Sequence, residues 1–377
     1  MDTDMDRLAD LRARTSQMVS DLEALVSAES FSYDLTGTAA CADELTRLAD
    51  RLLGVQPARL EIGGRSHVLW KKAERPRVLL VGHFDTVWPS GTLARWPFAV
   101  DGDRAGGPGA FDMKAGIVQG LHALSTLGDI DGVAFLFTSD EELGSPTSAP
   151  LIRELAASSA SALVLEPAAG GALKTGRKGV SMYSIDIAGR AAHAGLEPHK
   201  GANALIELAH QVLAISALAD AAAGTTVTPT VAHAGTATNV VPAAARIDVD
   251  VRIATLAEQE RIAKTMRALT PHISGTALTV VGDENRPPLE PSSAAALFER
   301  ASRIATTLGL GELQSVTVGG ASDGNFTAAE GCPTLDGLGA VGDGAHAEGE
   351  YVVVSEMAPR AALLAGLVEE LLREGAP

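Results

Sequence analysis

The sequence predicts an α/β protein in which a mixed, mostly parallel sheet is flanked by helices and a second, α+β unit is inserted. Two observations predict this fold class. Short apolar runs at residues 78–81, 133–137 and 162–165 alternate with helix-like stretches, which is the pattern of buried parallel strands covered by helices. A different rhythm of strands and helices begins near residue 179, and the first rhythm returns after residue 291.

Helices are expected at both ends of the chain. From about Met5 to Leu53, apolar residues recur at helical spacing without a proline. This pattern predicts two helices joined near residues 30–37. A last helix is expected over residues 356–372, with Ser355 as its N-cap.

The inserted unit is expected to form a four-stranded sheet with two helices on one face. Its expected order is strand 181–188, helix 203–219, strand 226–234, strand 245–252, helix 257–269 and strand 277–281. We therefore divide the 377 residues into a discontinuous larger domain, residues 1–178 and 284–377, and an inserted domain, residues 179–283.

Composition and charge exclude several classes of partner. Hydrophobic residues make up 46% of the chain and charged residues 20%, as in ordinary globular proteins. The formal net charge is −17, so we expect neither nucleic acid nor an anionic membrane surface as a partner. The acidic N-terminus has no apolar segment of the secretory kind. Cys41 and Cys332 lie far apart in sequence, which suits a reducing compartment, so the cytoplasm is the expected location.

Acids and histidines gather where the predicted strands end, which is where α/β proteins build their sites. The first strand runs into His83 and Asp85, and strand alternation sends both side chains to the same face. A histidine oriented by a carboxylate is typical of metal ligands. Asp112 stands between a Gly/Pro-rich loop and a helix start. Taken separately, a structural His–Asp hydrogen bond and a helix-capping Asp112 explain these residues as well.

Two further strands end in acids. Glu141 and Glu142 directly follow an apolar strand and are expected to point in different directions. One could then hold a metal while the other moves a proton, although a solvated acidic turn is the alternative. Glu166 ends another buried strand, where an ionised carboxylate needs a charged partner.

A last histidine, His346, stands in a Gly-rich loop, in which Glu348 and Glu350 are expected to be surface acids. Alone this motif is weak, but the combination of motifs is stronger. Two histidines and three carboxylates suit a pair of borderline divalent metals such as zinc, one carboxylate being shared. The candidate ligands are His83, Asp112, Glu142, Glu166 and His346.

The motifs GHFDTV, GPGAFDMKAG, SDEELGS, LEP and GDGAHAEGE resemble, in order, those of a di-zinc metallopeptidase family. That family includes glutamate carboxypeptidase, aminoacylase and succinyl-diaminopimelate desuccinylase, and the glutamate carboxypeptidase branch is the most similar. The resemblance implies that Asp112 bridges both metals, with His83 and Glu166 at one and Glu142 and His346 at the other. It further implies that Asp85 orients His83, that Glu141 is the general base, and that the peptide bond after Asp112 is cis.

The resemblance extends to the inserted unit, which corresponds to the family's lid and dimerisation domain. It implies a homodimer through residues 179–283, in which His193 reaches the partner subunit's site and polarises the scissile carbonyl. Asn239 and Arg252 match residues that contact substrate, and Gly320 lies in a Gly-rich substrate loop, residues 319–326. No role is assigned to the bulky or unexplained side chains of Trp88, Trp96, Phe111 and His122.

The implied reaction is hydrolysis of an amide or peptide bond next to a free carboxylate of a small-molecule substrate. Two divalent metal ions are the implied cofactors: zinc first, with cobalt or manganese as alternatives. Within the family, an aminoacylase, a dipeptidase or a deacylase of N-acyl amino acids remains open. Outside it, the alternatives are a two-metal phosphoesterase and a non-catalytic scaffold protein.

Overall fold

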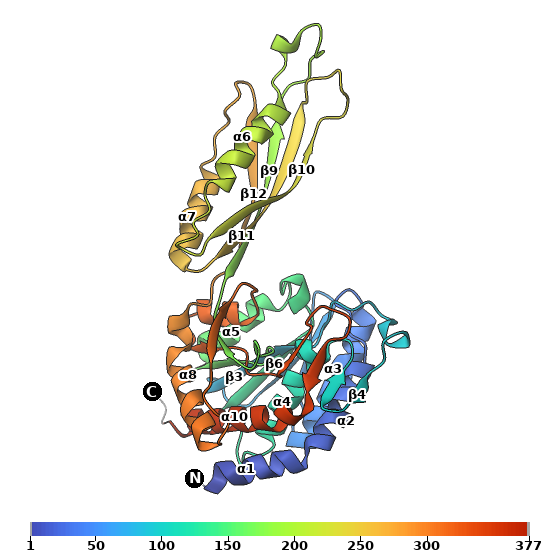
Figure 1. The fold of residues 1–377 in the computed structure, drawn as a ribbon, viewed down its shortest axis with the longest axis vertical. Coiled ribbons are helices and arrows are strands. Elements are labelled where there is room, and N and C mark those ends of the chain that lie inside the picture. The colour runs from blue at the N-terminus through green and yellow to red at the C-terminus, as the bar shows by residue number, and fades with distance from the viewer. Residues whose placement is uncertain (1, 375–377) are drawn as a thin grey trace. The chain divides into compact units, whose positions relative to one another are not determined.

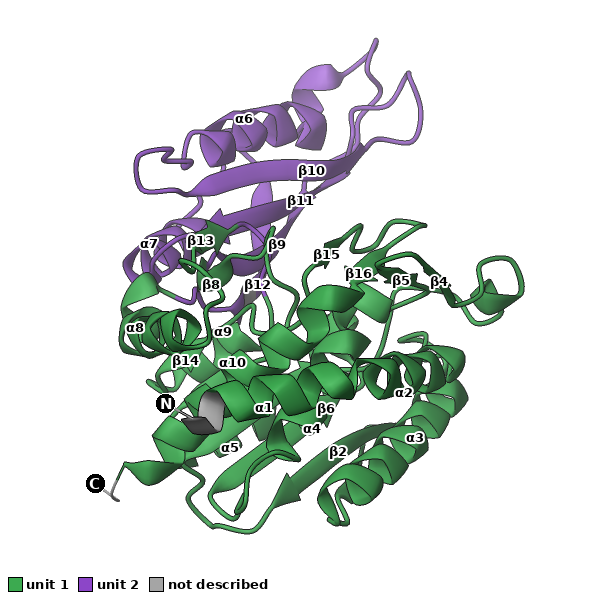
Figure 2. Cartoon of the chain, turned by 60° about the horizontal axis from the view of Figure 1, so that its bottom comes forward, with its two compact units in different colours: residues 1–176, 290–318, 322–377 green, residues 177–289, 319–321 purple. Residues whose placement is uncertain are grey.

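The computed structural model describes residues 2–374. The chain forms two compact units, which Figure 2 shows in different colours. Unit 1 comprises Met1–Gly176, Glu290–Val318 and Ser322–Pro377, and unit 2 comprises Arg177–Leu289 and Gly319–Ala321.

The centre of unit 1 is a six-stranded sheet with the order β1-β2-β6-β3-β7-β14. Strands β6, β3, β7 and β14 are parallel to one another, whereas β2 pairs in antiparallel fashion with both of its neighbours, β1 and β6. The strands are β1 (Ala58–Ile62), β2 (Arg65–Lys71), β3 (Val78–His83), β6 (Val133–Thr138), β7 (Ala162–Val164) and β14 (Thr334–Leu335). The predicted fold class, a mixed and mostly parallel sheet flanked by helices, is confirmed.

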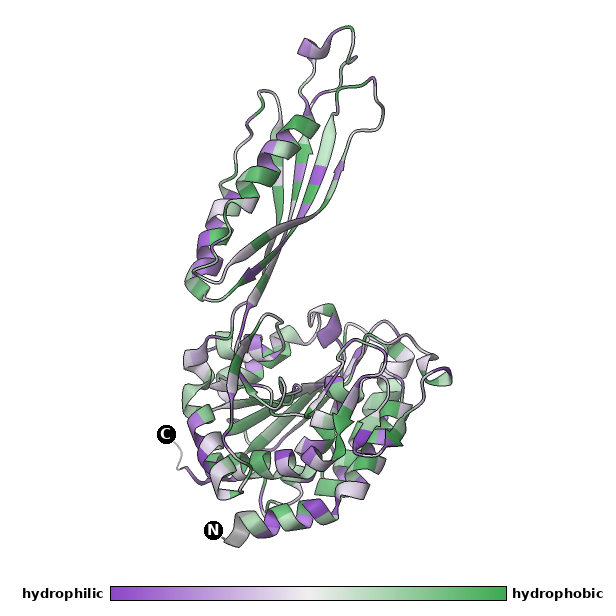
Figure 3. Cartoon of the chain, viewed as in Figure 1, coloured by the Kyte–Doolittle hydropathy of each residue, from purple (hydrophilic) through white to green (hydrophobic). Residues whose placement is uncertain are grey.

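Alternation along the central strands produces two apolar cores, one on each face of the sheet. On β3, Val78 and Leu80 belong to one core, and Leu79 and Val81 to the other. Helices α1 (Asp2–Ala13), α2 (Thr15–Ser27), α3 (Leu35–Leu53), α4 (Ala115–Leu124), α8 (Pro291–Thr307) and α10 (Val354–Arg373) contribute to the first core. Helices α5 (Ala149–Ser158) and α9 (Gly324–Ala329) contribute to the second. Because both faces are covered, the central strands β3 and β6 are hydrophobic except at their carboxyl ends (Figure 3).

The terminal helices differ from the prediction in two respects. The N-terminal segment forms three helices and not two, because α1 ends at Ala13 and α2 begins at Thr15. The last helix, α10, begins at Val354, so Ser355 is not its N-cap. Instead, the N–H and the hydroxyl of Ser355 donate to the carboxylate of Asp103, at 2.8 and 2.6 Å. An acid far away in sequence thus satisfies the free N–H group that a local cap would serve.

Two small sheets border the central one. One has the order β15-β16-β5-β4, and the other pairs β13 with β8. Their strands are β4 (Ala99–Asp101), β5 (Arg104–Gly106), β15 (Gly342–Asp343), β16 (Tyr351–Val353), β8 (Leu173–Arg177) and β13 (Ser315–Val318). The loop between β15 and β16 carries His346.

Unit 2 is a four-stranded antiparallel sheet with the order β10-β11-β9-β12 (Figure 1). Its strands are β9 (Gly179–Ala188), β10 (Thr226–Ala234), β11 (Ala244–Ile253) and β12 (Ala277–Arg286), and its helices are α6 (Ala204–Ser216) and α7 (Leu256–Arg267). Apolar side chains from both helices and from one face of the sheet form a single core that includes Ile185, Ile215, Ile247 and Ile262. The predicted inserted layer of four strands and two helices is therefore present. Within residues 2–374, no helix has both the length and the apolar character that crossing a membrane requires.

Candidate metal centre

The candidate ligands converge at one edge of the central sheet. Strands β6, β3 and β7 are neighbours and parallel, so their carboxyl ends meet at this edge. His83 is the last residue of β3, Glu142 follows β6, and Glu166 follows β7. Parallel pairing therefore brings together three ligand-type side chains that are separated by many residues in sequence.

Asp112 belongs to two clusters of ligand-type side chains. In the first, His83 Nε2 lies 3.3 Å from Asp112 Oδ1 and 3.6 Å from Glu166 Oε1. In the second, His346 Nε2 lies 3.3 Å from Asp112 Oδ2 and 3.1 Å from Glu142 Oε1. Within each cluster the candidate ligand atoms all lie within 4.8 Å of one another. Each carboxylate oxygen of Asp112 thus faces a different histidine.

The loop before Asp112 depends on glycine. Gly109 has a φ of 72°, and a Cβ there would lie 2.4 Å from Cγ2 of Thr86. Only glycine therefore allows the loop to pass so close to Thr86, in the segment that follows β3. After Asp112 the peptide bond to Met113 is cis, as the family resemblance implies. Gly116 lets α4 approach the chain after β7, since a Cβ there would lie 2.0 Å from the carbonyl oxygen of Leu165.

The electrostatics of the clusters follow from acids and histidines that lie close together and are partly or fully buried. Hydrogen bonds to Asp112 and Glu142 raise the pKa of His346 to about 10. Burial opposes protonation of His83, but Asp112, Asp85 and the nearby charge of Glu141 raise its pKa well above the usual value. Burial alone would raise the pKa of Asp112, but the two histidines beside it, His346 and His83, hold it below its usual range. Burial raises the pKa of Glu142.

These residues fit a pair of bound metal ions. Asp112 Oδ1 is buried and has no hydrogen-bond partner among the described residues, although it lies in the first cluster. Imidazole nitrogens and carboxylate oxygens are the donor set that zinc and similar divalent ions take. The site runs from His83, of which 2% is exposed, to His346, whose side chain is 52% exposed. One end is thus buried and the other open.

Asp85 connects the candidate ligands with the acidic loop. Its Oδ1 accepts the N–H of Glu141 at 3.1 Å and its Oδ2 accepts the N–H of Glu142 at 3.2 Å. The ring of His83 places Nδ1 3.0 Å from the carbonyl oxygen of Asp85 and 3.4 Å from its Oδ1. The backbone carbonyl, more than the carboxylate, therefore accepts from Nδ1–H, and this leaves Nε2 as the ligand atom.

Glu350 is buried, and the expectation of a surface acid is wrong. Its side chain accepts the indole Nε1–H of Trp88 and the backbone N–H of Phe111, each at 3.3 Å. Burial raises the pKa of Glu350 to about 8. Its carboxylate is covered by Trp88 and by the loop that carries Phe111, both distant in sequence. Glu348 is exposed and pairs with Arg95 at 2.6 Å, as a surface acid does.

The expected substrate residues lie in unit 2, at two ends of its sheet. His193 and Asn239 are exposed and adjacent: the N–H of Ala194 donates to the carbonyl oxygen of Asn239 at 2.9 Å. Arg252 pairs in register with Val180 at the other end of the long strands, whereas Ala244 pairs with Ala188. At about 3.3 Å per residue, roughly 25 Å of strand separates the two ends. One small substrate cannot touch both ends of one unit 2.

The expected Gly-rich loop, residues 319–326, is divided between the units. Gly320 belongs to unit 2 and is exposed, and its carbonyl oxygen accepts from Arg177 Nη1 at 3.1 Å. Asp323 belongs to unit 1 and is buried, and its Oδ2 accepts from Thr138 Oγ1 at 3.1 Å. The second half of the loop is thus bound to the end of β6.

Comparison with known proteins agrees with this geometry. A family model described as Peptidase family M20/M25/M40 matches residues 79–370. Carboxypeptidase G2 from Pseudomonas sp. is 32% identical over 94% of this chain and 89% of its own length. The chain belongs to the M20 peptidase family. The resemblance read from the motifs is therefore confirmed, and this M20 peptidase is a hydrolase of amide bonds.

Other relatives of this M20 peptidase differ in the substrates that their names state. Succinyl-diaminopimelate desuccinylase from Delftia acidovorans is 30% identical over 97% of this chain and all of its own length (100%). The crystal structure of aminopeptidase PepT from Bacillus cereus superposes with a TM-score of 0.76, at 22% identity, over 95% of this chain and 99% of that one. This chain therefore shares its fold with that aminopeptidase.

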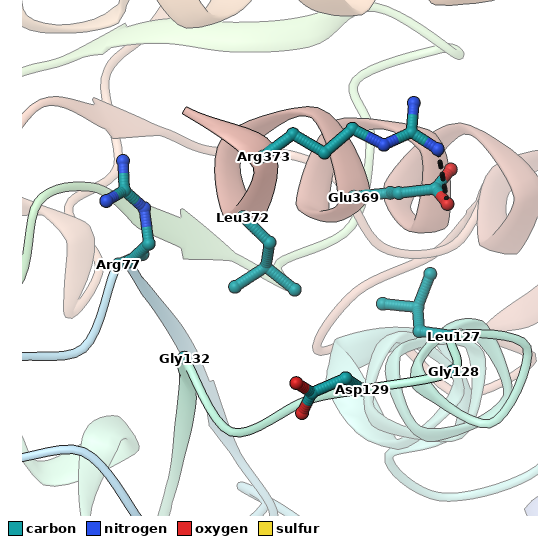
Figure 4. A pocket seen from close by; sticks show the side chains of 8 residues that line it. All are labelled: Arg77, Leu127, Gly128, Asp129, Gly132, Glu369, Leu372 and Arg373. Carbon is teal, nitrogen blue, oxygen red and sulfur yellow. Dashed lines mark ion pairs between the residues drawn. The ribbon is translucent and has the colours of Figure 1, made fainter. Parts of the chain in front are cut away.

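A separate hollow of about 360 Å³ in this M20 peptidase lies away from the clusters (Figure 4). Arg77 lines it and directly precedes β3, whereas His83 ends β3, so the hollow lies near the opposite edge of the sheet. Its charged groups already have partners. Arg77 Nε donates to the carbonyl oxygen of Leu371 at 3.0 Å, and Arg373 pairs with Glu369 at 2.8 Å. These contacts stabilise the end of α10.

Two residues near the ligand clusters had no role predicted from the sequence. Ser32 Oγ lies 2.8 Å from Asp85 Oδ2, and Glu350 contacts the loop before Asp112. Lys174 is a local cation beside a proposed ligand, since its Nζ lies 3.9 Å from Glu166 Oε2. The sequence held no signal for Ser32 or Glu350, because the burial of Glu350 depends on distant residues and a serine between two helices is ordinary.

Proposed function

We propose that this M20 peptidase is a two-metal hydrolase, with zinc as the first candidate, that cleaves an amide bond next to a free carboxylate. The observation that carries the proposal is the position of Asp112, whose two oxygens face two separate clusters of histidine and carboxylate. A carboxylate in this position can bridge two cations. Without cations, the acids of the clusters would repel one another.

Each metal would have three protein ligands, one of which, Asp112, is shared between the two metals. Asp112 would bridge, His83 and Glu166 would complete one site, and Glu142 and His346 the other. Three ligand carboxylates offset most of the four positive charges that two divalent ions bring. When bound, the metals supply an acidified water and an electrophile for the substrate carbonyl.

Glu141 is the proposed general base, and Asp85 the residue that holds it. Glu141 precedes a proposed ligand, and Asp85 accepts its backbone N–H. Its charge acts on His83 but it belongs to neither ligand cluster. A carboxylate so placed can take a proton from water and pass it to the leaving nitrogen.

His193 is the proposed donor to the carbonyl oxygen of the substrate. Its Nδ1 accepts the N–H groups of Gly195 and Leu196, both at 3.2 Å. In the neutral ring the proton therefore resides on Nε2, which makes this exposed nitrogen a hydrogen-bond donor. Such a donor stabilises the charge that develops on the carbonyl oxygen.

The distance between His193 and Arg252 supports an active site shared by two subunits. Roughly 25 Å of strand separates them within one unit 2, so both can contact one substrate only if they come from different chains. We propose a homodimer through residues 179–283, with this segment as the lid and dimerisation domain. Residues 1–178 and 284–377 would form the metal-binding catalytic domain.

Arg252 is the proposed partner of the substrate carboxylate, and Asn239 and Gly320 are proposed substrate contacts. A guanidinium binds a carboxylate through two parallel hydrogen bonds, and the net charge of −17 makes such a local cation necessary. The 32% identity to carboxypeptidase G2 favours a glutamate carboxypeptidase-like substrate. The 30% identity to a desuccinylase supports the alternative, an N-acyl-amino-acid deacylase, aminoacylase or dipeptidase.

Hydrolysis of a substrate panel tests this proposal. Folate-like glutamates, N-acyl amino acids and dipeptides are assayed with zinc, cobalt or manganese. Each substrate is compared with an analogue in which a carboxamide replaces the free C-terminal carboxylate. We expect two metal ions per chain, hydrolysis only of the substrates that carry a free carboxylate, and the highest kcat/KM on one class of acyl group. A chain that binds no divalent metal, or that cleaves the carboxamides equally well, would contradict the proposal.

The cytoplasm is the proposed location. Cys41 and Cys332 are both buried and not joined in a disulfide, and burial raises the pKa of Cys332 to about 12. Thiols kept reduced in this way suit a reducing compartment.

A further inference from the structure

A short segment between α2 and α3, residues 30–32, runs beside the chain that leaves β3. The N–H of Thr86 donates to the carbonyl oxygen of Ser30 at 2.9 Å, and the N–H of Ser32 donates to that of Thr86 at 3.1 Å. The two stretches therefore pair in parallel. This segment lies outside residues 79–370, the part of the chain that the family model matches.

Within this segment, the side chain of Ser32 contacts Asp85, the acid beside the two clusters of ligand-type side chains. Its hydroxyl lies 2.8 Å from Asp85 Oδ2 and 3.0 Å from the carbonyl oxygen of Thr86. Only 1% of Ser32 is exposed. Arg65 secures the backbone there, since its Nη1 lies 2.6 Å from the carbonyl oxygen of Ser32 and 3.3 Å from that of Ser139. The segment is thus attached both to β3 and to the end of β6.

Asp85, the acid that Ser32 contacts, also has several other neighbours. Asp85 is fully buried, and it accepts the N–H groups of Glu141 and Glu142 while lying beside the ring of His83. A carboxylate with two oxygens can serve this many donors only in one orientation. Its rotation would release the acidic loop and move Oδ1 away from the ring of His83, which would keep its hydrogen bond to the backbone carbonyl oxygen of Asp85.

We propose that Ser32 is a positioning residue of the metal centre, which acts by holding the carboxylate of Asp85 in the orientation that fixes the Glu141–Glu142 loop and with it the proposed ligand Glu142. The proposal rests on the proposed two-metal function and deepens it. Side chains that orient metal ligands without binding the metal themselves typically contribute 10–100-fold to metal affinity or activity. Ser32 thereby makes the N-terminal helices part of the site.

The chain offers a matched control for this role. Ser30 lies in the same buried segment, and its hydroxyl donates to the carbonyl oxygen of Phe84 at 2.5 Å without contacting Asp85. Ser30→Ala therefore removes a buried hydrogen bond of the same segment but none to the acid. A general loosening of the segment would affect both variants, whereas positioning of Asp85 affects only Ser32→Ala.

Zinc affinity of the purified full-length variants, measured in competition with a chelator, is the first readout. We expect Ser32→Ala to weaken zinc binding and to lower kcat by roughly 10–100-fold with little change in KM. Ser30→Ala should stay within about threefold of wild type in both. Thermal unfolding and circular dichroism check that each variant folds, and Ser32→Cys, of similar volume, carries the test if Ser32→Ala does not fold.

A double-mutant cycle with Asp85→Ala decides whether Ser32 acts through Asp85. Once Asp85 is absent, Ser32→Ala should weaken zinc binding no further. Additive losses, or equal losses in Ser30→Ala and Ser32→Ala, would overturn the proposal. Wild type that binds two zinc ions while Ser32→Ala binds them equally well would refute only this role, whereas wild type that binds no zinc would refute the proposed function itself.

Discussion

Arg252 and Asp250 form a two-point ion pair on one face of the unit 2 sheet. Nε of Arg252 lies 2.9 Å from Asp250 Oδ1, and Nη2 lies 2.9 Å from Oδ2. The side chains are 37% and 31% exposed, so solvent screens the pair and its effect on stability is small. The pair occupies the Nε and Nη2 edge of the guanidinium, so a substrate carboxylate would bind at the remaining Nη1 and Nη2 edge.

Arg252→Ala should weaken substrates with a free carboxylate selectively. A charge-assisted hydrogen bond contributes about 1.5–3 kcal/mol, so we expect kcat/KM to fall about 10–100-fold on carboxylates and little on the matching carboxamides. Arg252→Lys is the control, since it keeps the charge but loses the two-point geometry. An equal loss on both substrate series would contradict the pairing.

Glu141→Ala should keep the bound metals and lose turnover. General base catalysis contributes roughly 10²–10⁴-fold, so kcat should fall by that amount while metal content stays at the wild-type level. Glu142→Ala, one residue further on, should lose metal as well. Metal analysis by mass spectrometry beside steady-state kinetics distinguishes them, and near-wild-type turnover of Glu141→Ala would remove Glu141 from this role.

His193→Ala should lower turnover strongly, and mixing should recover part of the activity. When His193→Ala is mixed with the metal-site variant His83→Ala, each hybrid dimer would hold one complete site. His199→Ala is a matched control, because His199 is also exposed in the same loop region. A mixture no more active than its two components would argue against an active site shared between subunits.

Zinc binding to the metal-free protein should release protons. The pKa of His346 is about 10 without metal, so His346 is protonated at pH 7–9, and a metal can bind its Nε2 only after that proton leaves. Affinity should therefore rise with pH up to about 10. Calorimetric titrations in two buffers of different ionisation enthalpy count the protons, and identical heats in both would contradict the expectation.

Glu207→Ala should destabilise unit 2. Glu207 is fully buried, and its Oε2 accepts the N–H groups of His272 and Ile273 at 2.9 and 2.6 Å. Leaving these donors without an acceptor should cost about 2–4 kcal/mol in the free energy of unfolding. Glu260→Ala, at an exposed position of α7, should change it by less than about 0.5 kcal/mol. Urea denaturation of the full chain measures both, and equal effects would refute the assigned role of Glu207.

Several elements of the fold were predictable because their signals are local. Strands β3 and β6 are apolar runs, because both faces of their sheet are buried. The four strands of unit 2 alternate between apolar and polar residues, because only one face of their sheet is buried. The break at Arg14 between α1 and α2 was missed, because residues on both sides of it continue the helical spacing of apolar side chains. The burial of Glu350 was missed as well, because it depends on Trp88 and Phe111, which are distant in sequence.

The sequence by itself determined the fold class, the family, and which acids and histidines stand at strand ends, because these are properties of neighbouring residues along the chain. Only the tertiary structure decided that Asp112 faces two clusters and that Asp85 accepts the N–H groups of Glu141 and Glu142. It also decided that the hydroxyl of Ser32 contacts the carboxylate of Asp85. Such contacts depend on parallel pairing of strands and on the path of loops between them. The directions of individual side chains emerge only when distant segments pack together.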